Sequence, residues 1–378
     1  MLWDSHRFIE NHPGKSTLRL VRMTVSRRPD SRPLMAVRLD DWVHRRREKR
    51  ALKRGRKPGV IPYIGYGSPE WIRVLGRVLY LPSPVQSDAE SEGNDPSLQP
   101  VVAQVARVRG WRSFTSVHVP HHPVSVFIDG KHLTEVASDR GGVVDHVVPV
   151  QLTPGWHTVT LQAAGGEAAN APVYVVDPAA KFGLLSDVDD TILNTALPRP
   201  LVAAWNSFVV DEHARTSTPG MPVLYDHLLA KHPGSPVIYL STGAWNVAPS
   251  LSRFLERNLY PMGSLLLTDW GPTTDRWFRS GKDHKLRELE RLAREFPEIR
   301  WVLVGDDGQH DEELYQRFAT SHPQNVAAVA IRQLSVGQAV LAGGRSKARL
   351  QRSVSGVPWV YGPDGATLRQ ELLALGLL

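Results

Sequence analysis

The chain has 378 residues, enough for two domains that each bury a core, and its formal net charge is +7 at pH 7. The absence of cysteine excludes disulfides, thiolate catalysis and zinc sites with cysteine ligands. No apolar run approaches the length of a membrane-spanning helix, and the first residues lack the basic start and apolar centre of a secretory signal. We therefore expect a cytoplasmic protein.

The N-terminal part carries most of the positive charge. The first 34 residues show mixed polarity and little periodicity, and we expect a flexible extension. Residues 35–60 predict a basic helix, with the acidic pair Asp40-Asp41 in its first turn, where the helix dipole favours acids. Nine Lys or Arg residues and one Glu stand between His44 and Lys57. This segment is either a solvated helix, a surface for anionic lipid or a nucleic-acid site.

Residues 61–177 predict an all-β domain. Short alternating apolar segments, such as 72–79, 124–128 and 157–161, are separated by Gly, Pro and Asp. We expect a β-sandwich of immunoglobulin-like or transthyretin-like type. The sequence does not indicate the function of this domain. The simplest interpretation is that it packs against the domain that follows it.

Two features of this region carry no predicted chemistry. Residues 83–100 are acidic, rich in Ser and Pro and poor in apolar side chains, so we expect a mobile loop. His118, His121 and His122 cluster, but two prolines interrupt their spacing and no acidic residue is adjacent. For these histidines we expect a solvated loop rather than a zinc site.

Residues 178–378 predict an α/β domain with a parallel sheet. Three apolar runs, 182–185, 237–240 and 301–304, each end in polar side chains. In open parallel sheets, ligands bind outside the carboxyl ends of the strands, so these side chains are expected to converge on one crevice. An apolar helix is predicted near the C-terminus, over residues 368–378.

The first of these runs leads into the sequence Asp187-Val188-Asp189-Asp190-Thr191. Alternate side chains of an extended segment point the same way, so Asp187 and Asp189 are expected to face one pocket. One carboxylate can then attack phosphorus while the other transfers protons. Taken alone, a short acidic run is more often a solvated turn.

Polar residues farther along the chain match further motifs of a known superfamily. Ser241 ends the second run, Lys285 lies in a charged helical stretch, and Gly305-Asp306 with Asp311 follows the third. Over residues 178–335 the chain resembles the haloacid-dehalogenase-like phosphatase superfamily, whose catalytic domain has a Rossmann-like fold.

The residues around these motifs give a narrower resemblance. The chain is similar to the catalytic domain of the yeast actin-patch phosphatidate phosphatase family and its bacterial relatives. The similarity lies in three short segments, Ser186 to Ile192, Leu267 to Gly271, and Gly305 to Asp311. The second motif departs from those relatives, because Ser241 is followed here by Thr-Gly-Ala-Trp. The resemblance implies magnesium-dependent hydrolysis of phosphatidate to diacylglycerol and phosphate through an aspartyl-phosphate.

The resemblance also implies roles for individual residues. Asp187 attacks phosphorus, and Asp189 protonates the leaving alkoxide and later activates water. Ser241 and Lys285 donate to phosphoryl oxygens, and Thr191 fixes the turn. Mg²⁺ is expected on a set of oxygen ligands from the acidic residues: Asp187, Asp306, the backbone carbonyl of Asp189, and Asp307 or Asp311.

Several of these residues also have an interpretation without a catalytic role, or a neighbour that could take the role. Ser241 is also suited to cap a helix, and Lys282 is an alternative to Lys285 as the ligand of the phosphoryl group. Asp307 and Asp311 are equally interpretable as turn residues. Residues 197–221 predict a flap over the site, whose apolar side chains either contact acyl chains or pack on their own core.

Two alternative functions stay open at this point. The chain is interpretable as a phosphatase of a soluble phosphomonoester, or as a membrane or cytoskeletal adaptor with a vestigial catalytic domain. An anionic membrane surface is a possible partner of the basic helix, and no nucleic-acid substrate is expected. The acyl preference and the oligomeric state cannot be inferred from the sequence.

Overall fold

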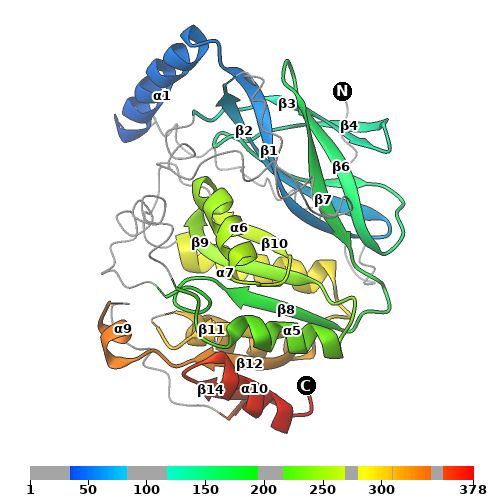
Figure 1. Ribbon diagram of the computed structural model, residues 1–378, viewed down its shortest axis with the longest axis vertical. Helices are drawn as coiled ribbons and strands as arrows, with labels where there is room; N and C mark the ends of the chain where they lie inside the picture. Colours follow the sequence, from blue (N-terminus) through cyan, green and yellow to red (C-terminus); the bar gives the residue numbers. More distant parts are fainter. Residues whose placement is uncertain (1–34, 83–116, 195–215, 269–279, 309, 342–351) are drawn as a thin grey trace, which may run out of the picture.

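The computed structural model describes residues 35–378 except 83–116, 195–215, 269–279, 309 and 342–351, and describes only the backbone of residues 35–41, 280, 282 and 341. Two seven-stranded sheets make up the described part (Figure 1). The predicted extension, the predicted mobile loop and most of the predicted flap lie outside the described residues. Among the helices that are described, none is long and apolar enough to cross a membrane.

The basic segment begins with helix α1 (Met35–Lys53). The helix starts early enough to place Asp40 and Asp41 in its second turn, so the prediction that they occupy the first turn is wrong. It ends before Gly55, whose positive φ of 67° is the left-handed conformation that commonly terminates helices. The segment predicted as helix up to residue 60 therefore already enters the first strand.

The first sheet has the strand order β4-β3-β6-β7-β1-β2-β5. Its strands are β1 (Lys57–Ser68), β2 (Trp71–Leu81), β3 (Pro123–Ile128), β4 (Lys131–Ala137), β5 (Val143–Pro149), β6 (Gly155–Ala163) and β7 (Ala168–Val175). All neighbours pair antiparallel except β1 and β7, which are parallel. The edge strands β4 and β5 contact each other. The strands form one continuous sheet, so the sandwich of two facing sheets stays a prediction.

The second sheet has the order β10-β9-β8-β11-β12-β14-β13. Its strands are β8 (Phe182–Asp187), β9 (Val237–Ala244), β10 (Ser264–Thr268), β11 (Arg300–Asp306), β12 (Val326–Arg332), β13 (Ser353–Val354) and β14 (Val357–Gly362). All pairs are parallel except β13 with β14. Strands β8 and β12 are buried along their whole length, as expected of strands covered on both faces. The predicted parallel arrangement of the three apolar runs is confirmed.

Helices lie between the strands of this sheet, and one more follows its last strand. They are α5 (Met221–Lys231), α6 (Ala248–Arg257), α7 (Ser280–Glu295), α8 (Asp311–Ser321), α9 (Val336–Leu341) and α10 (Gly365–Ala374), with short 3-10 turns η1 (Trp245–Val247) and η2 (Pro323–Asn325). Helices α5 and α10 contact each other in front of the sheet in Figure 1, and α7 contacts α8. Helix α10 confirms the predicted C-terminal helix, although it ends at Ala374.

The two sheets share a hydrophobic core. Tyr63 and Tyr66 of β1 belong to the same buried cluster as the strands of the second sheet. The hydroxyl of Tyr66 donates to Glu295 at 2.8 Å, and burial raises its pKa. The ring of Tyr63 stacks on Trp245 with centroids 5.1 Å apart, and its hydroxyl donates to the backbone oxygen of Trp245 at 3.4 Å. The first sheet therefore contacts the segment directly after β9.

Candidate functional site

The candidate site lies at the carboxyl end of the second sheet. Asp187 is the last residue of β8 and Asp306 the last residue of β11, while Ser241 lies near the end of β9. Strand β8 lies between β9 and β11, and all three are parallel. The topology thus brings these side chains to one edge, as expected from their positions at the ends of parallel strands.

Three buried carboxylates form an acidic cluster at this edge. The cluster consists of Asp187, Asp306 and Asp311, with one oxygen atom of each within 4.8 Å of the others. Their exposed fractions are 2%, 5% and 4%. Carboxylates at this separation repel each other when they are all ionised, so the cluster requires cations or protons.

Lys285 supplies one of these cations. It projects from α7 with an exposed fraction of 8%, and its Nζ lies 2.5 Å from Asp187 Oδ1 and 2.6 Å from Asp311 Oδ1. Burial alone would lower the pKa of Lys285, but the two carboxylates outweigh burial and raise it, so the ammonium stays charged. Burial, and next the carboxylate of Asp311, hold the pKa of Asp187 well above its usual range. The side chain of Lys282, the rival ligand, lies outside the described residues.

The turn after β8 is held by two further residues. Asp190 has a positive φ of 58°, which is uncommon for a residue with a Cβ. Arg332, at the end of β12, donates from Nη1 to the backbone oxygen of Asp190. The hydroxyl of Thr191 lies 3.2 Å from Asp187 Oδ2 and 3.4 Å from Asp306 Oδ2. Thr191 thus contacts two carboxylates of the acidic cluster, and the turn-fixing role expected for it stays a prediction.

Arg332 was not among the residues singled out from the sequence. Its exposed fraction is 4%, and burial lowers its pKa. It also donates from Nη2 to Gln338 at 3.3 Å. The available signal was its position after the apolar run that forms β12, because a charged residue at the end of a fully buried strand lies at the ligand-binding edge of a parallel sheet.

Ser241 is fully buried and contacts the second aspartate of the first motif. Its hydroxyl donates to Asp189 Oδ2 at 3.1 Å and accepts from the backbone N–H of Gly243 at 2.9 Å. The interpretation of Ser241 as a helix cap is wrong, because the residue preceding α6 is Val247 and the one preceding η1 is Ala244. Asp189 is half-buried, and the hydrogen bond from Ser241 orients its carboxylate.

Asp307 is not among the carboxylates of the acidic cluster. Its Oδ1 accepts from the backbone N–H of Leu334 at 2.8 Å. The neighbouring glycines leave no room for side chains: a Cβ at Gly305 would lie 2.8 Å from Asp311 Oδ2. The structure thus brings Asp311 and not Asp307 to Asp187 and Asp306, and a role for Asp307 as a metal ligand stays a prediction.

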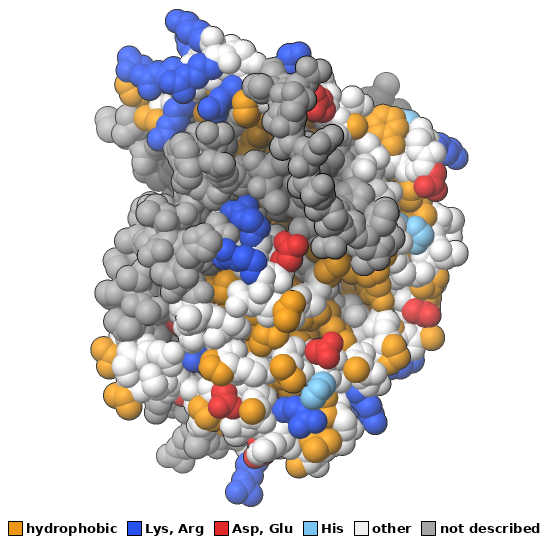
Figure 2. Space-filling model, in the orientation of Figure 1, with side chains coloured by type: hydrophobic (Ala, Val, Ile, Leu, Met, Phe, Trp, Pro, Cys, Tyr) orange, Lys and Arg blue, Asp and Glu red, His pale blue; other side chains and the backbone are white. Residues whose placement is uncertain are grey.

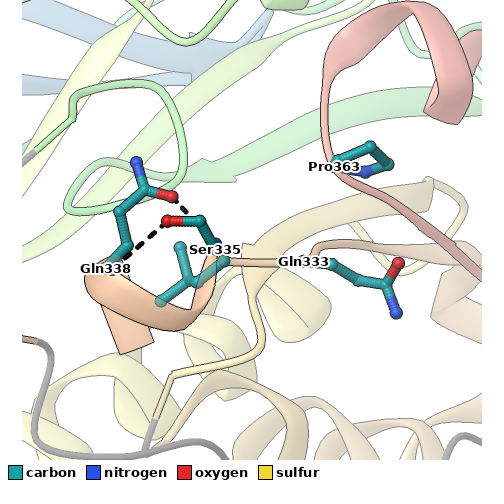
Figure 3. A pocket seen from close by; sticks show the side chains of 5 residues that line it. Gln333, Ser335, Gln338 and Pro363 are labelled. Atoms are coloured by element: carbon teal, nitrogen blue, oxygen red, sulfur yellow. Dashed lines mark hydrogen bonds between the residues drawn. The ribbon is translucent and has the colours of Figure 1, made fainter. Parts of the chain in front are cut away.

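A pocket of about 380 Å³ opens beside the segment that follows β12 (Figure 3). It is lined by Gln333, Leu334, Ser335, Gln338 and Pro363. Gln338 and Ser335 point toward each other, with Gln338 Oε1 accepting from the backbone N–H of Ser335 at 3.0 Å (Figure 3). The side-chain amide of Gln338 also donates to Asn194 at 3.2 Å, three residues after Thr191. The pocket thus adjoins the loop that carries the first motif.

Comparison with known sequences finds proteins that are similar to the part of the chain that forms most of the second sheet. The model of the family described as "Phosphatidate phosphatase APP1, catalytic domain" matches residues 182–333. Phosphatidate phosphatase APP1 of Saccharomyces cerevisiae is 27% identical over 154 residues, which is 40% of this chain and 26% of the relative. An uncharacterized protein of Schizosaccharomyces pombe is 23% identical over 212 residues, 51% of this chain and 33% of the relative. The chain thus spans about a quarter to a third of the length of these curated relatives.

Solved structures give more distant similarities. The HAD domain of effector protein Lem4 from Legionella pneumophila aligns with a TM-score of 0.29 and 14% identity, covering 44% of this chain and 93% of that domain. A chain of the Pnkp1/Rnl/Hen1 RNA repair complex aligns with a TM-score of 0.29 and 18% identity, covering 42% of this chain and 44% of that one. TM-scores of this size carry no conclusion about the fold. Residues 182–333 thus match the family model of the APP1-type phosphatidate phosphatase catalytic domain, and the yeast relative is similar to this chain over 154 residues.

Proposed function

We propose that residues 178–378 form a haloacid-dehalogenase-like, Rossmann-like phosphatase domain that hydrolyses phosphatidate to diacylglycerol and phosphate. Residues 61–177 form its β-sandwich neighbour, and the protein acts in the cytoplasm, at a membrane surface. The observation that carries the proposal is the acidic cluster with Lys285 at the carboxyl end of a parallel sheet. The family match over residues 182–333 and the activity named for the yeast relative support phosphatidate as the substrate.

The donor set of the acidic cluster fits Mg²⁺. Three carboxylates face one lysine, so the cluster keeps an excess of negative charge when all groups are ionised. Their oxygen atoms are the hard ligands that Mg²⁺ prefers. Asp187, Asp306 and Asp311 would hold the ion, with the backbone carbonyl of Asp189 and with Asp307 as further candidates. When bound, Mg²⁺ neutralises charge on the phosphoryl group.

The side chains of the site divide the reaction between them. A carboxylate oxygen of Asp187 attacks phosphorus and forms an aspartyl-phosphate as the alkoxide of diacylglycerol leaves. Asp189 gives a proton to that alkoxide and then takes one from the water that hydrolyses the intermediate. The hydrogen bond from Ser241 at 3.1 Å orients the Asp189 carboxylate for both transfers.

Two donors stabilise the charge that builds up on the phosphoryl oxygens. The ammonium of Lys285 is held in place before the substrate arrives, and a donor of this kind contributes about 3–4 kcal/mol. The hydroxyl of Ser241 has a single proton, so it becomes the second donor only when that proton turns from Asp189 to a phosphoryl oxygen. Thr191 keeps the attacking carboxylate oriented through its contact of 3.2 Å with Asp187 Oδ2. The half-buried Asp189 leaves a path for water to the intermediate.

The test is phosphate release from phosphatidate vesicles and from a soluble phosphomonoester, with Mg²⁺ and with a chelator. We expect Mg²⁺-dependent release that prefers phosphatidate and that Asp187→Asn abolishes. Asp226→Asn, an exposed change on α5, is the matched control and should retain full activity. If phosphate were released from the soluble phosphomonoester as fast as from phosphatidate, the proposal that phosphatidate is the substrate would be wrong. No release from either substrate would overturn the catalytic proposal.

A further inference from the structure

Helix α1 is fixed to the first sheet by one of its faces. This inner face consists of His44, Glu48 and Ala51, which recur at the spacing of one helix side. The ring of His44 stacks on His118 with centroids 4.1 Å apart, and the hydroxyl of Tyr80 donates to Glu48 Oε1 at 2.9 Å. Ala51 has an exposed fraction of 4% within the core of the sheet. The helix is therefore held in one orientation.

The opposite face of α1 presents cations and an indole to solvent. This outer stripe consists of Trp42, Arg46, Lys49 and Lys53, spaced at i, i+4, i+7 and i+11. All four are exposed, and Trp42 has an exposed fraction of 48%. The guanidinium of Arg46 lies 4.0 Å from the centroid of the Trp42 ring. Figure 2 shows Lys and Arg side chains gathered over α1 at the top of the molecule.

This combination of side chains matches one kind of surface. Lys and Arg are attracted to the headgroups of anionic lipids, and Trp is enriched at the boundary between headgroups and acyl chains. A helix that lies flat on a membrane carries such residues on the side away from its protein. The exposed Leu52, with an exposed fraction of 53%, adds an apolar side chain beside the outer stripe.

We propose that the outer stripe of α1 binds the surface of an anionic lipid bilayer. In Figure 1 α1 lies on the side of the molecule toward which the arrow of β8 points, which is the side of the acidic cluster. The binding does not rest on the proposed activity, since the attraction depends on the charge of the surface and not on a phosphomonoester.

The test is sedimentation of the full chain with vesicles of phosphatidylcholine, with and without phosphatidylglycerol. Phosphatidylglycerol is anionic but is a phosphodiester, so the catalytic edge is not expected to capture it as a substrate. The variant carries Arg46→Ala, Lys49→Ala and Lys53→Ala, which preserve helix propensity. A matched control removes three exposed cations elsewhere: Lys131→Ala, Arg294→Ala and Arg317→Ala.

We expect the full chain to bind the anionic vesicles at low salt, and the outer-stripe variant to lose roughly 100-fold in partition coefficient, because each cation near the surface contributes about 1 kcal/mol. The control variant should lose less than about tenfold, and added salt should weaken the binding of the wild type. Asp187→Asn should bind like the wild type, which separates this proposal from the catalytic one. Equal losses in both triple variants, or tighter binding to duplex DNA than to the vesicles, would overturn the proposal.

Discussion

Replacing Lys285 by Met tests the electrostatics of the acidic cluster. The ammonium lies 2.5 Å from Asp187 and 2.6 Å from Asp311, and all three side chains are nearly inaccessible to solvent. Removing one partner of a buried ion pair commonly costs about 3–5 kcal/mol, because the remaining charge has no partner. Met has a similar length, so little of the loss comes from packing. We expect the free energy of unfolding to fall by about that amount, with a Tm lower by roughly 10 °C.

The loss should depend on pH. Without the ammonium, which lowers the pKa of Asp187, that pKa rises further above the value of about 3.9 in the unfolded chain. The folded state then binds more protons than the unfolded state, so its stability relative to the wild type recovers as the pH falls. Urea unfolding at about pH 7 and about pH 5 measures this recovery, and the deficit of Lys285→Met should be smaller at the lower pH.

A surface ion pair supplies the matched control. Lys181 lies 2.9 Å from Glu298, but their side chains have exposed fractions of 63% and 71%. Lys181→Met should therefore change the stability by about 1 kcal/mol or less. If Lys285→Met were no more destabilising than Lys181→Met, or if its deficit were equal at both pH values, the assignment of a buried and charged cluster would be refuted.

Three further predictions concern residues outside the acidic cluster. Tyr63→Leu removes the stack on Trp245 and should lower the free energy of unfolding by about 1–3 kcal/mol. An unchanged midpoint of urea unfolding would show that this contact between the two sheets does not stabilise the protein. Burial lowers the pKa of His118 to about 4, from 6.5, so the unfolded chain binds more protons and the wild type should lose stability as the pH falls from about 6.5 to about 4. His118→Asn should flatten this part of the stability profile by roughly 1–2 kcal/mol after allowance for partial exposure, and an identical slope in both proteins would contradict the shift. Arg332→Lys cannot reproduce the planar contacts that hold the backbone oxygen of Asp190, so kcat on phosphatidate should fall about tenfold, or about 1.4 kcal/mol in the barrier, with little change in KM. An unchanged kcat would show that Arg332 does not position the turn.

The strands of the second sheet were predictable because their signal is local. Each of the runs 182–185, 237–240 and 301–304 is apolar throughout and stops at a polar residue, which is typical of a parallel strand that ends at a ligand-binding edge. The spacing of carboxylates, serine and lysine then placed Asp187, Ser241 and Lys285 near one another. The structure brings these residues together without requiring any unusual backbone apart from the turn at Asp190.

What the sequence did not indicate depends on packing between distant segments. Arg332 follows an apolar strand as many surface arginines do, and only the position of β12 beside β11 brings it near Asp190. Tyr63 contacts Trp245 because the two sheets pack together, and no local pattern encodes that contact. The start of α1 at residue 35 agrees with the predicted range, but the acidic pair Asp40-Asp41 was wrongly placed in its first turn, because the preference of acidic residues for that turn was taken as the signal.

The central position of β8 also has a consequence during synthesis. The strand is made before both of its neighbours, and the last residue of β11 follows it by a stretch that takes roughly ten seconds to translate at usual rates. For that time at least the edge of β8 that pairs with β11 stays open, which invites pairing with other nascent chains. Chains cut between residues 187 and 306 should therefore aggregate more than chains that stop at the end of the first sheet, although they contain Asp187.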